Sequence, residues 1–524
     1  MTESRREVAL REAGTTKQWD VVVIGGGASG LGAALEAASR GYRTLLIERQ
    51  DFAKGTSSRS TKLVHGGVRY LAQFNVTLVI EALRERGYML RNAPHLVHRV
   101  PFIVPVYSYS NLPYYGLGLK LYEWLSGRLS LGKSSVLTEE EVIDRLPTIR
   151  RDGLKGGILY YDGQFDDARY AITLLRSIED AGGFAINYVE AIGLIKRNGR
   201  IVGVRARDIE SDSELEISAR VVVNAGGVFA EEILDMDAAG TASFITLSQG
   251  THFVLPLSWL PGGNALMVPK TDDGRVLFAI PWHQHVIVGT TDEPVAQASV
   301  EPHSLLRERE FLSSHIQRFL GRSVAAKDVL SVWSGLRPLV RKGKGNTSKL
   351  SRDHRILVSP SGLVTVIGGK WTTYRRMGED TIDRAASVGK LPSAPSRTAN
   401  LHLHGWIPNE FPGSVEEAER VYGSDLPALQ ALSKDDATMD NLLHPRLPYK
   451  RQEVVWSVRH EMARNVEDVL ARRTRALSLD ARAAIEAAPT VATLIARELG
   501  RDGAWAKSNL DSFQQLASSY LYED

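Results

Sequence analysis

The stretch that decides the fold is residues 19–48, WDVVVIGGGASGLGAALEAASRGYRTLLIE. Its apolar opening predicts a buried parallel strand, which runs directly into Gly25-x-Gly27-x-x-Gly30 and then into a helix with apolar positions at helical spacing. The glycines permit a tight turn, a close approach of backbone N–H groups to a pyrophosphate, and close packing of helix on strand. A second strand ends in Glu48, which is placed to accept hydrogen bonds from a ribose. The unit therefore predicts a dinucleotide site with phosphates at the helix N-terminus.

Composition restricts the class of protein and its chemistry. A chain of 524 residues is too long for one compact core, so two or three domains are expected. Hydrophobic residues make up 43% and charged residues 24%, which is typical of a soluble globular protein. The 64 basic and 61 acidic residues leave a net charge of +3, which gives no indication of a nucleic-acid partner. The absence of cysteine excludes disulfides, thiolate metal sites and a redox dithiol, so a bound cofactor must carry any redox chemistry.

No segment of the sequence predicts a signal peptide or a spanning helix. Residues 1–17 form a polar, charged N-terminal tail without the apolar centre of a secretory signal. Residues 100–119 and 244–269 lack Asp, Glu, Lys and Arg, but prolines and glycines interrupt both. We therefore expect a cytoplasmic protein, either free or attached to a membrane surface.

Two further strand–glycine–helix transitions predict additional contacts with the same cofactor. An apolar strand at residues 219–223 leads into Asn-Ala225-Gly226-Gly, and another at residues 362–367 leads into Gly-Gly369-Lys370. Each would aim backbone N–H groups at an anion. Residues 51–71 are rich in hydroxyls, glycine and positive charge, and they suit the floor of the site, with a solvated loop as the alternative.

The remainder of the chain divides into a sheet region and a helical region. Residues 244–294 read as antiparallel strands of a substrate domain, at 251–256, 264–269, 276–281 and 285–289. We predict a discontinuous cofactor domain at 18–386, with the substrate sheet at about 72–150 and 244–340, a linker at 387–405 and a helical domain at 406–524. Helices are predicted at residues 76–92, 167–182, 415–422, 452–461, 466–471, 480–488, 490–499 and 505–520.

One helical face suggests a membrane contact. Leu117, Leu121, Trp124 and Leu125 fall on one side of a predicted helix, with Lys120 and Arg128 near it. Such a face either rests on anionic lipid or packs on its own domain, and the sequence leaves both alternatives open.

Four strings are more specific than the glycine turn. They are TSSRSTKLVHGGVRYL at residues 56–71, IPW with GTTD at 280–282 and 289–292, SGLRPL at 334–339, and GGKWTTYR at 368–375. Together they closely resemble the FAD-dependent, quinone-linked glycerol-3-phosphate dehydrogenases, over about residues 19–385. The helical C-terminal region is similar to that family's C-terminal domain.

The resemblance implies the fold and the reaction. It implies an α/β glutathione-reductase-like FAD domain of the Rossmann type, an antiparallel sheet domain over the flavin, and an all-helical C-terminal domain. The implied reaction oxidises sn-glycerol 3-phosphate to dihydroxyacetone phosphate by hydride transfer from C2 to flavin N5. Electrons pass to a membrane quinone, and the protein attaches peripherally to the cytoplasmic membrane, with a homodimer as one open assembly state.

The resemblance also implies a substrate site. The substrate-binding residues that it implies are Arg69, Tyr70, His252, Arg337, Arg352 and Lys370. The cations suit a phosphomonoester, which carries nearly two negative charges, and the planar fork of arginine binds phosphate oxygens in pairs. Pro338 favours an extended, loop conformation at Arg337.

Catalysis needs a base for the substrate hydroxyl, and a neutral imidazole suits this task near pH 7. His252 and His65 are the candidates, with a structural histidine as the alternative for each. We expect His252 to act on the substrate with Arg337, and His65 to orient the flavin or assist the base.

The expected cofactor-binding residues comprise the glycine turns, the acidic strand end and the hydroxyl-rich loop. They are Gly25, Gly27, Ala28, Ser29, Gly30, Glu48, Arg49, Thr56, Ser57, Ser58, Lys62, Leu63, His65, Gly66, Gly67, Val189, Ala225, Gly226, Gly369, Lys370, Thr372 and Thr373. FAD bound without a covalent link follows, because no cysteine is available for a thioether.

Several alternatives stay open. His283 and His285 would share one face of a strand, but no third ligand lies nearby, so no metal site is predicted. The basic segment 341–349, RKGKGNTSK, departs from what we expect of some relatives. The functional alternatives are an oxidase that uses O₂, an FAD-dependent amine or 2-hydroxy-acid oxidoreductase, and a flavin-containing assembly protein without catalysis.

Overall fold

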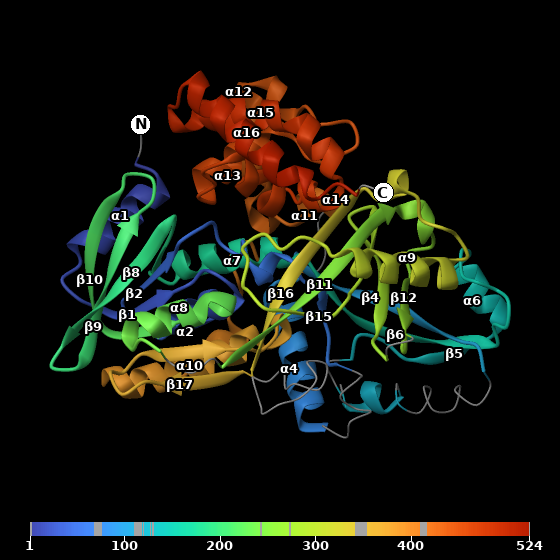
Figure 1. Cartoon of the computed structure of the whole chain (residues 1–524), viewed down its shortest axis with the longest axis horizontal. Helices are drawn as coiled ribbons and strands as arrows, with labels where there is room; N and C mark the ends of the chain where they lie inside the picture. Colours follow the sequence, from blue (N-terminus) through green and yellow to red (C-terminus); the bar gives the residue numbers. More distant parts are fainter. Residues whose placement is uncertain are drawn as a thin grey trace.

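A computed structural model describes residues 3–67, 76–108, 118, 120–125, 127, 130–240, 244–271, 274–340, 354–408 and 417–522. Within these ranges the strands form two sheets, of eight and ten strands, and a helical domain lies above the junction between them (Figure 1). This arrangement confirms the predicted fold class.

The first sheet contains the predicted dinucleotide unit. Its order is β17-β18-β10-β1-β2-β7, with β8 and β9 forming an antiparallel extension of β10. β1 pairs in parallel with β10 on one side and β2 on the other, and β10 pairs in parallel with β18. The strands are β1 (Trp19–Ile24), β2 (Thr44–Glu48), β7 (Phe184–Asn187), β8 (Val189–Arg197), β9 (Arg200–Asp208), β10 (Ser213–Asn224), β17 (Arg355–Val358) and β18 (Val364–Ile367).

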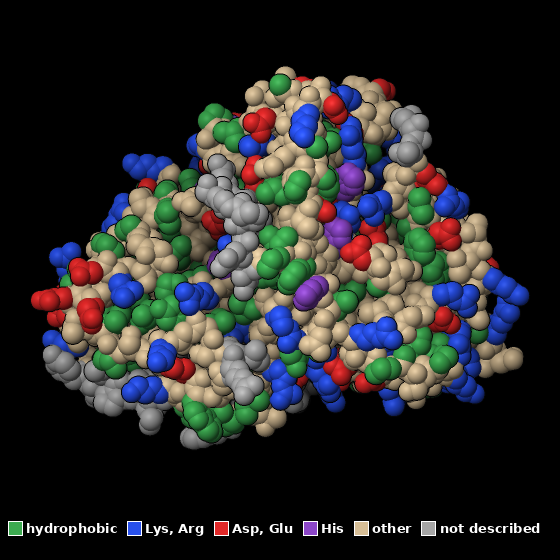
Figure 2. Space-filling model, turned by 180° about the vertical axis from the view of Figure 1, so that it is seen from behind, with side chains coloured by type: hydrophobic (Ala, Val, Ile, Leu, Met, Phe, Trp, Pro, Cys, Tyr) green, Lys and Arg blue, Asp and Glu red, His purple; other side chains and the backbone are tan. Residues whose placement is uncertain are grey.

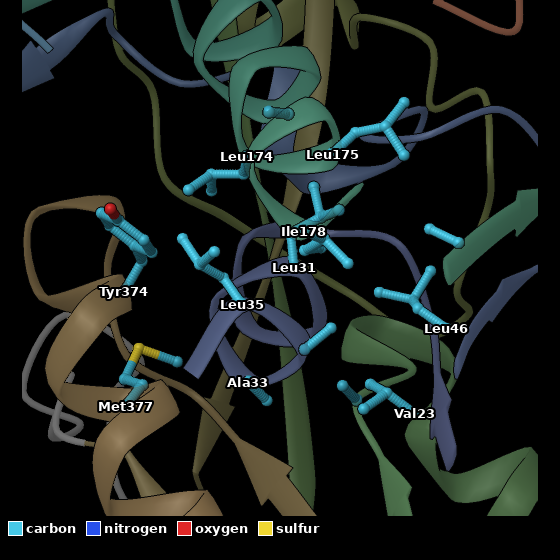
Figure 3. Packing of buried hydrophobic residues seen from close by; sticks show 14 of the residues in the cluster. Val23, Leu31, Ala33, Leu35, Leu46, Leu174, Leu175, Ile178, Tyr374 and Met377 are labelled. Atoms are coloured by element: carbon cyan, nitrogen blue, oxygen red, sulfur yellow. The ribbon is translucent and has the colours of Figure 1, made fainter. Parts of the chain in front are cut away.

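Helix α2 (Ala28–Ser39) lies at the centre of the core of this domain. Its buried side chains pack between α7 (Asp167–Asp180) and α10 (Tyr374–Gly389), beside the strands that contribute Val23 and Leu46 (Figure 3). Gly32 and Gly378 allow α2 and α10 to approach closely, because a Cβ at Gly378 would lie 2.5 Å from the carbonyl oxygen of Gly32. The helix that carries the glycine turn is therefore held from both sides.

The second sheet has the order β15-β11-β14-β13-β12-β4-β6-β3, with β16 beside β11 and β5 beside β6. Its neighbouring strands are antiparallel except for β12 and β4, so the predicted antiparallel sheet is in fact mixed. Strands β3 and β6 lie outside the two predicted segments. The strands are β3 (Leu63–Val64), β4 (Val97–Val106), β5 (Ser135–Leu137), β6 (Gly156–Phe165), β11 (Ile245–Pro256), β12 (Ala265–Val268), β13 (Leu277–Trp282), β14 (His285–Gly289), β15 (Glu293–Val295) and β16 (Ser331–Val340).

Three helices accompany this sheet. α4 (Val76–Asn92) has the predicted bounds, whereas α6 (Glu139–Arg145) and α9 (Leu306–Leu320) were not predicted. α9 presents Leu312, Ile316 and Leu320 to a core formed with the sheet.

The helical domain contains fewer breaks than the sequence suggested. The predicted helices 480–488 and 490–499 are one helix, α15 (Ala481–Leu499), with Pro489 inside it. Residues 468–473 form a π-helical turn, and the other helices are α11 (Glu417–Arg420), α12 (Leu426–Asp435), α13 (Arg451–His460), α14 (Ala476–Leu479) and α16 (Gly503–Ser518).

Two segments that were predicted as a tail and a linker are packed. The tail contains α1 (Arg5–Thr15), which has a capping box at Ser4 and an ion pair from Arg6 to Asp208. In the linker, Thr398 donates a hydrogen bond to the buried Glu36 of α2. The polar composition of the tail and the linker did not predict either contact, because each contact depends on a buried carboxylate from a distant segment.

Buried ion pairs join the helical domain to the loop that follows β2. Asp51 is fully buried and receives hydrogen bonds from Arg472 at 2.5 Å and Arg473 at 2.7 Å. Burial alone would raise the pKa of the Asp51 carboxyl, but the two guanidiniums hold it well below its usual range. The pairing keeps both sides charged, so separating the domains would expose a costly set of unpaired charges.

His404, at the end of the linker, makes the docking of this segment dependent on pH. Its two ring nitrogens hydrogen-bond Asp180 of α7 at 2.7 Å and Asp425, next to α12, at 2.8 Å. Burial opposes the charged ring, but the two carboxylates raise the pKa of His404 to about 9. The stabilisation is therefore complete below the unfolded pKa of about 6.5 and is lost as the pH rises through about 9.

We expect His404→Gln to lower the melting temperature by roughly 2 °C at pH 6.5, and the deficit to disappear by pH 10 because wild type then loses the same ion pairs. Thermal unfolding of both proteins across this pH range measures the difference. A deficit that stays constant from pH 6.5 to pH 10 would contradict the ionic role of His404.

Candidate active site

One cavity of about 810 Å³ has walls from both sheets. The first sheet contributes the turns after β1, β2, β10 and β18, and the second contributes residues of β4, β6, β11, β12, β13 and β16. This volume is within the usual range for ligand pockets.

Three glycine turns meet at this cavity. They follow β1, β10 and β18, and each leads into a helix or a 3₁₀ turn. Because these three strands are parallel neighbours, their carboxyl ends lie at one edge of the sheet, where such folds bind ligands. The sequence predicted each turn separately, and the sheet brings them together.

The first turn leaves room only for backbone. Gly25 has a φ of +112°, and a Cβ there would lie 2.5 Å from the carbonyl oxygen of Ala225. A Cβ at Gly30 would overlap the carbonyl of Gly25, so this glycine serves the packing of α2 and does not line the cavity. The residues present therefore fit the phosphates of a dinucleotide, which approach backbone N–H groups closely.

Glu48 lies at the end of β2 beside this turn. Its carboxylate accepts hydrogen bonds from the backbone N–H of Gly26 at 2.5 Å and of Gln50 at 2.8 Å. Burial raises the pKa of Glu48, and the backbone donors oppose that shift. The carboxylate is thus fixed at the cavity wall, where it can bind a ribose.

The hydroxyl-rich loop forms part of the cavity wall. Ser57 accepts a hydrogen bond from the N-terminal backbone N–H of Ala28 at 2.9 Å, and its carbonyl accepts one from the Trp371 indole at 2.8 Å. Thr56 donates to the carbonyl of Leu336 in β16 at 2.6 Å. The loop therefore connects the two sheets at the cavity.

His252 lies on β11 and lines the cavity. Its ring stacks on Trp333, with centroids 4.2 Å apart, and its Nε2 lies 3.0 Å from the hydroxyl of Thr61. Burial is the main cause of a pKa well below the usual value for His252, and the cations Arg337 and Lys62 add to it. The imidazole is therefore neutral, as a proton acceptor must be.

Arg337 lies on β16, so the predicted extended conformation is confirmed but the predicted loop is wrong. It pairs with Ser248 of β11, while His252 pairs with Trp333, and alternation along the strands directs all four side chains to one face. The guanidinium hydrogen-bonds the hydroxyl of Thr290 at 2.9 Å and the carbonyl of Thr291 at 3.2 Å. Gly250 lies beside it, where a Cβ would overlap the guanidinium.

The remaining predicted residues are distributed as follows. Those that also line the cavity are Gly27, Ala28, Ser29, Arg49, Leu63, His65, Gly67, Val189, Gly226, Gly369, Lys370 and Thr372. Those that lie behind its wall are Ser58, Lys62, Gly66 and Thr373. Arg69, Tyr70 and Arg352 lie outside the described residues, as do Leu117, Arg128 and the basic segment 341–349.

Some residues near the site were not predicted. Thr61 and Phe229 line the cavity, and Trp333 supports His252 from below. The guanidinium of Arg49 lies over the ring of Phe229, and the distance from Cζ of Arg49 to the ring centroid is 4.1 Å. Only the tertiary structure brings these side chains to the site, although Thr61 stands within the quoted TSSRSTKLVHGG string.

His283 and His285 do not share a strand face. His283 and Gln284 have φ values of +46° and +61° and form the turn between β13 and β14. His283 lies 3.4 Å from Asp166, whereas Nδ1 of His285 lies 2.6 Å from the His283 carbonyl. Within the described residues, no group of three or more His, Cys, Asp or Glu side chains could hold a metal ion.

Comparisons with known proteins agree with this geometry. A family model described as FAD dependent oxidoreductase matches residues 20–375, and one described as the C-terminal domain of alpha-glycerophosphate oxidase matches residues 410–506. The mitochondrial glycerol-3-phosphate dehydrogenase of Rattus norvegicus is 37% identical over 99% of this chain and 75% of its own length. The corresponding protein of Arabidopsis thaliana is 38% identical over 99% of this chain and 88% of its own length.

Solved structures extend the comparison. The glycerol-3-phosphate dehydrogenase from Bacillus halodurans, complexed with FAD, superposes with a TM-score of 0.79 at 27% identity, covering 99% of this chain and 98% of that one. The L-alpha-glycerophosphate oxidase from Mycoplasma pneumoniae shares the fold, with a TM-score of 0.57 at 15% identity, over 75% of this chain and 100% of that one. With FAD as its cofactor, this chain therefore belongs to the family of FAD-dependent glycerol-3-phosphate dehydrogenases.

Proposed function

We propose that the protein oxidises sn-glycerol 3-phosphate to dihydroxyacetone phosphate and transfers the electrons to a membrane quinone. The observation that carries the proposal is the position of His252 and Arg337 on one face of two paired strands, inside the cavity that the three glycine turns also line. When bound, FAD supplies the hydride acceptor, N5 of its ring. The family assignment supports the same reaction.

The cations of the cavity would bind the phosphate group of the substrate. The guanidinium of Arg337 is held in a fixed orientation by Thr290 and Thr291, so a substrate phosphate would meet a preorganised fork. Lys370, at the turn before α10, adds a point charge at the wall. Arg69 and Arg352 are proposed to complete the set.

We assign to His252 the role of the base that receives the proton of the C2 hydroxyl. A neutral imidazole beside Arg337 can accept this proton while the phosphate is held by the cations. His65 lies on the same cavity wall, with its backbone N–H 3.2 Å from the hydroxyl of Thr372, and we assign it to orienting the flavin.

The glycine turns and the loop at residues 55–67 would hold the cofactor without a covalent bond. The N-terminus of α2 would bind the phosphates and Glu48 would accept hydrogen bonds from a ribose, so attraction to the helix dipole and hydrogen bonds would fix the dinucleotide. The hydrogen bond from the Trp371 indole to the Ser57 carbonyl joins the turn after β18 to the loop after β2.

A surface near α4 suits the membrane contact. Of the helices in the described ranges, none combines the length and apolar character needed to cross a bilayer. In the helical segment 120–125, Trp124 is 75% and Leu121 is 40% exposed, while Tyr122 points inward. Val76 and Ile80 add exposed apolar side chains one turn apart on α4, and hydrophobic side chains gather at the lower edge of the face in Figure 2. We propose that this surface rests on anionic lipid at the cytoplasmic membrane.

We expect the purified protein to be yellow and to release its flavin on acid precipitation, because no cysteine exists for a thioether link. Absorbance of the supernatant and of the redissolved pellet measures the distribution of flavin. A pellet that retains the yellow colour would rule out non-covalent binding.

Arg337→Ala should lower kcat/KM roughly 30- to 1000-fold, a loss of about 2–4 kcal/mol, because a charge-assisted paired contact with the phosphate disappears. FAD content should stay at the wild-type level, since the glycine turns are untouched. Arg207→Ala is the matched control, because that arginine lies on β9 and does not line the cavity. An Arg337→Ala enzyme within about threefold of wild type would remove Arg337 from the substrate site.

Replacing both Leu121 and Trp124 with Ser should release the protein from anionic liposomes and leave turnover with a soluble dye acceptor intact, because both side chains are exposed. Co-sedimentation at low and high salt measures the binding. Leu306→Ser, which removes an exposed leucine from α9, is the control. Unchanged co-sedimentation of the double variant would place the membrane contact elsewhere.

A further inference from the structure

The hydroxyl of Thr61 lies at the nitrogen through which His252 exchanges its proton. Nε2 of His252 lies 3.0 Å from Oγ1 of Thr61, and both residues line the cavity. The other ring nitrogen, Nδ1, is buried and has no hydrogen-bond partner among the described residues. Of the two ring nitrogens, Nε2 is therefore the one with a proton-exchanging partner among the described residues.

The residues on either side of Thr61 are fixed to one carboxylate. Asp167 accepts hydrogen bonds from the backbone N–H of Ser60 at 3.0 Å and from its hydroxyl at 2.7 Å. The ammonium of Lys62 donates to both oxygens of Asp167, at 2.8 and 2.7 Å, and to the carbonyl of Ser58 at 2.7 Å. Lys62 adopts a left-handed backbone, with φ of +61°, and is fully buried. Lys62 is buried behind the cavity wall, while Ser60 and Thr61 line the cavity.

The ring of His252 has little freedom to turn. Trp333 stacks on it at an interplanar angle of 21°, and a Cβ at Gly289 would overlap its Cδ2. The Thr61 hydroxyl can then meet Nε2 in only one orientation of the imidazole. A threonine hydroxyl has one proton and two lone pairs, so it can donate to the neutral Nε2 while it accepts a hydrogen bond from a substrate hydroxyl.

We propose that Thr61 relays the proton in the oxidation: its hydroxyl takes the proton of the C2 hydroxyl and passes its own proton to Nε2 of His252. The inference rests on the proposed role of His252 as the base. In the step concerned, the O–H bond of the C2 hydroxyl breaks and a new O–H bond forms at Oγ1 of Thr61, while the original Thr61 O–H bond breaks and an N–H bond forms at Nε2. The C2 hydrogen leaves as a hydride to FAD, and Thr61 ends the step with one proton, as it began.

The test compares Thr61→Val, which removes the hydroxyl at nearly constant volume, with Thr61→Ser, which keeps it. Anaerobic stopped-flow bleaching of the flavin by sn-glycerol 3-phosphate separates substrate affinity from the limiting rate. We expect Thr61→Val to lower the limiting rate about 10- to 100-fold with the dissociation constant within about threefold, and Thr61→Ser to stay within about threefold of wild type. Thr148→Val is the matched control, because it removes a partly buried threonine hydroxyl that donates to the carbonyl of Trp259 and does not line the cavity.

Nitrogen NMR of the holoenzyme labelled with ¹⁵N-histidine gives a readout that is independent of turnover. The His252 resonances, assigned with His252→Gln, should show one neutral tautomer with Nε2 accepting a hydrogen bond, and Thr61→Val should shift the Nε2 signal. FAD content from the absorbance ratio verifies folding, and Thr61→Ala replaces the valine variant if that variant fails to retain FAD.

Two results would overturn the proposal. One is a Thr61→Val enzyme with the wild-type rate and unchanged His252 resonances, and the other is a Thr61→Ser enzyme as slow as Thr61→Val, since the hydroxyl would then be irrelevant. His252→Gln distinguishes this failure from failure of the proposed function. If His252→Gln reduces flavin at the wild-type rate, the assignment of the base is wrong, whereas a slow His252→Gln with a fast Thr61→Val refutes the role of Thr61 alone.

Discussion

The site depends on the hydrogen bonds and ion pairs that the carboxylate of Asp167 forms. This carboxylate lies at the start of α7, fully buried, and it binds Ser60 and Lys62 of the loop that borders the cavity. Arg475 of the helical domain approaches it to 3.4 Å. A buried carboxylate without partners would be very costly, so the chain supplies a cation or donor from each segment that meets there. One charged group thus fixes the cofactor-facing loop, α7 and the helical domain relative to one another.

The cations that meet Asp167 also act on the chemistry of the cavity. Burial, together with Arg475, lowers the pKa of Lys62 to about 7, and Asp167 opposes this shift. The ammonium lies 4.8 Å from the centre of the Trp333 ring, on which His252 stacks. The positive potential from Lys62 and Arg337, added to burial, keeps His252 neutral. The structural ion pair and His252, the proposed proton acceptor, are therefore parts of one electrostatic arrangement.

The helical domain has a structural part in this arrangement. Arg472 and Arg473 neutralise Asp51, and Arg169 pairs with Glu461 at 2.8 Å from the other side of the same interface. These side chains are almost fully buried, and they come from segments that are several hundred residues apart. The domain thus stabilises the loop after β2, although none of its described residues lines the cavity.

The sequence by itself determined the dinucleotide unit, because strand, glycine turn, helix and acidic strand end are local features with fixed spacing. It also determined the other two glycine turns, the family and most helices of regular periodicity, such as α4 with its predicted bounds. Only the tertiary structure decided that Thr61 meets His252, that Arg337 stands in a strand, and that the polar tail and the linker are packed. These contacts join residues far apart in the chain. Their partners follow from strand register and buried charge pairing, which local patterns do not encode.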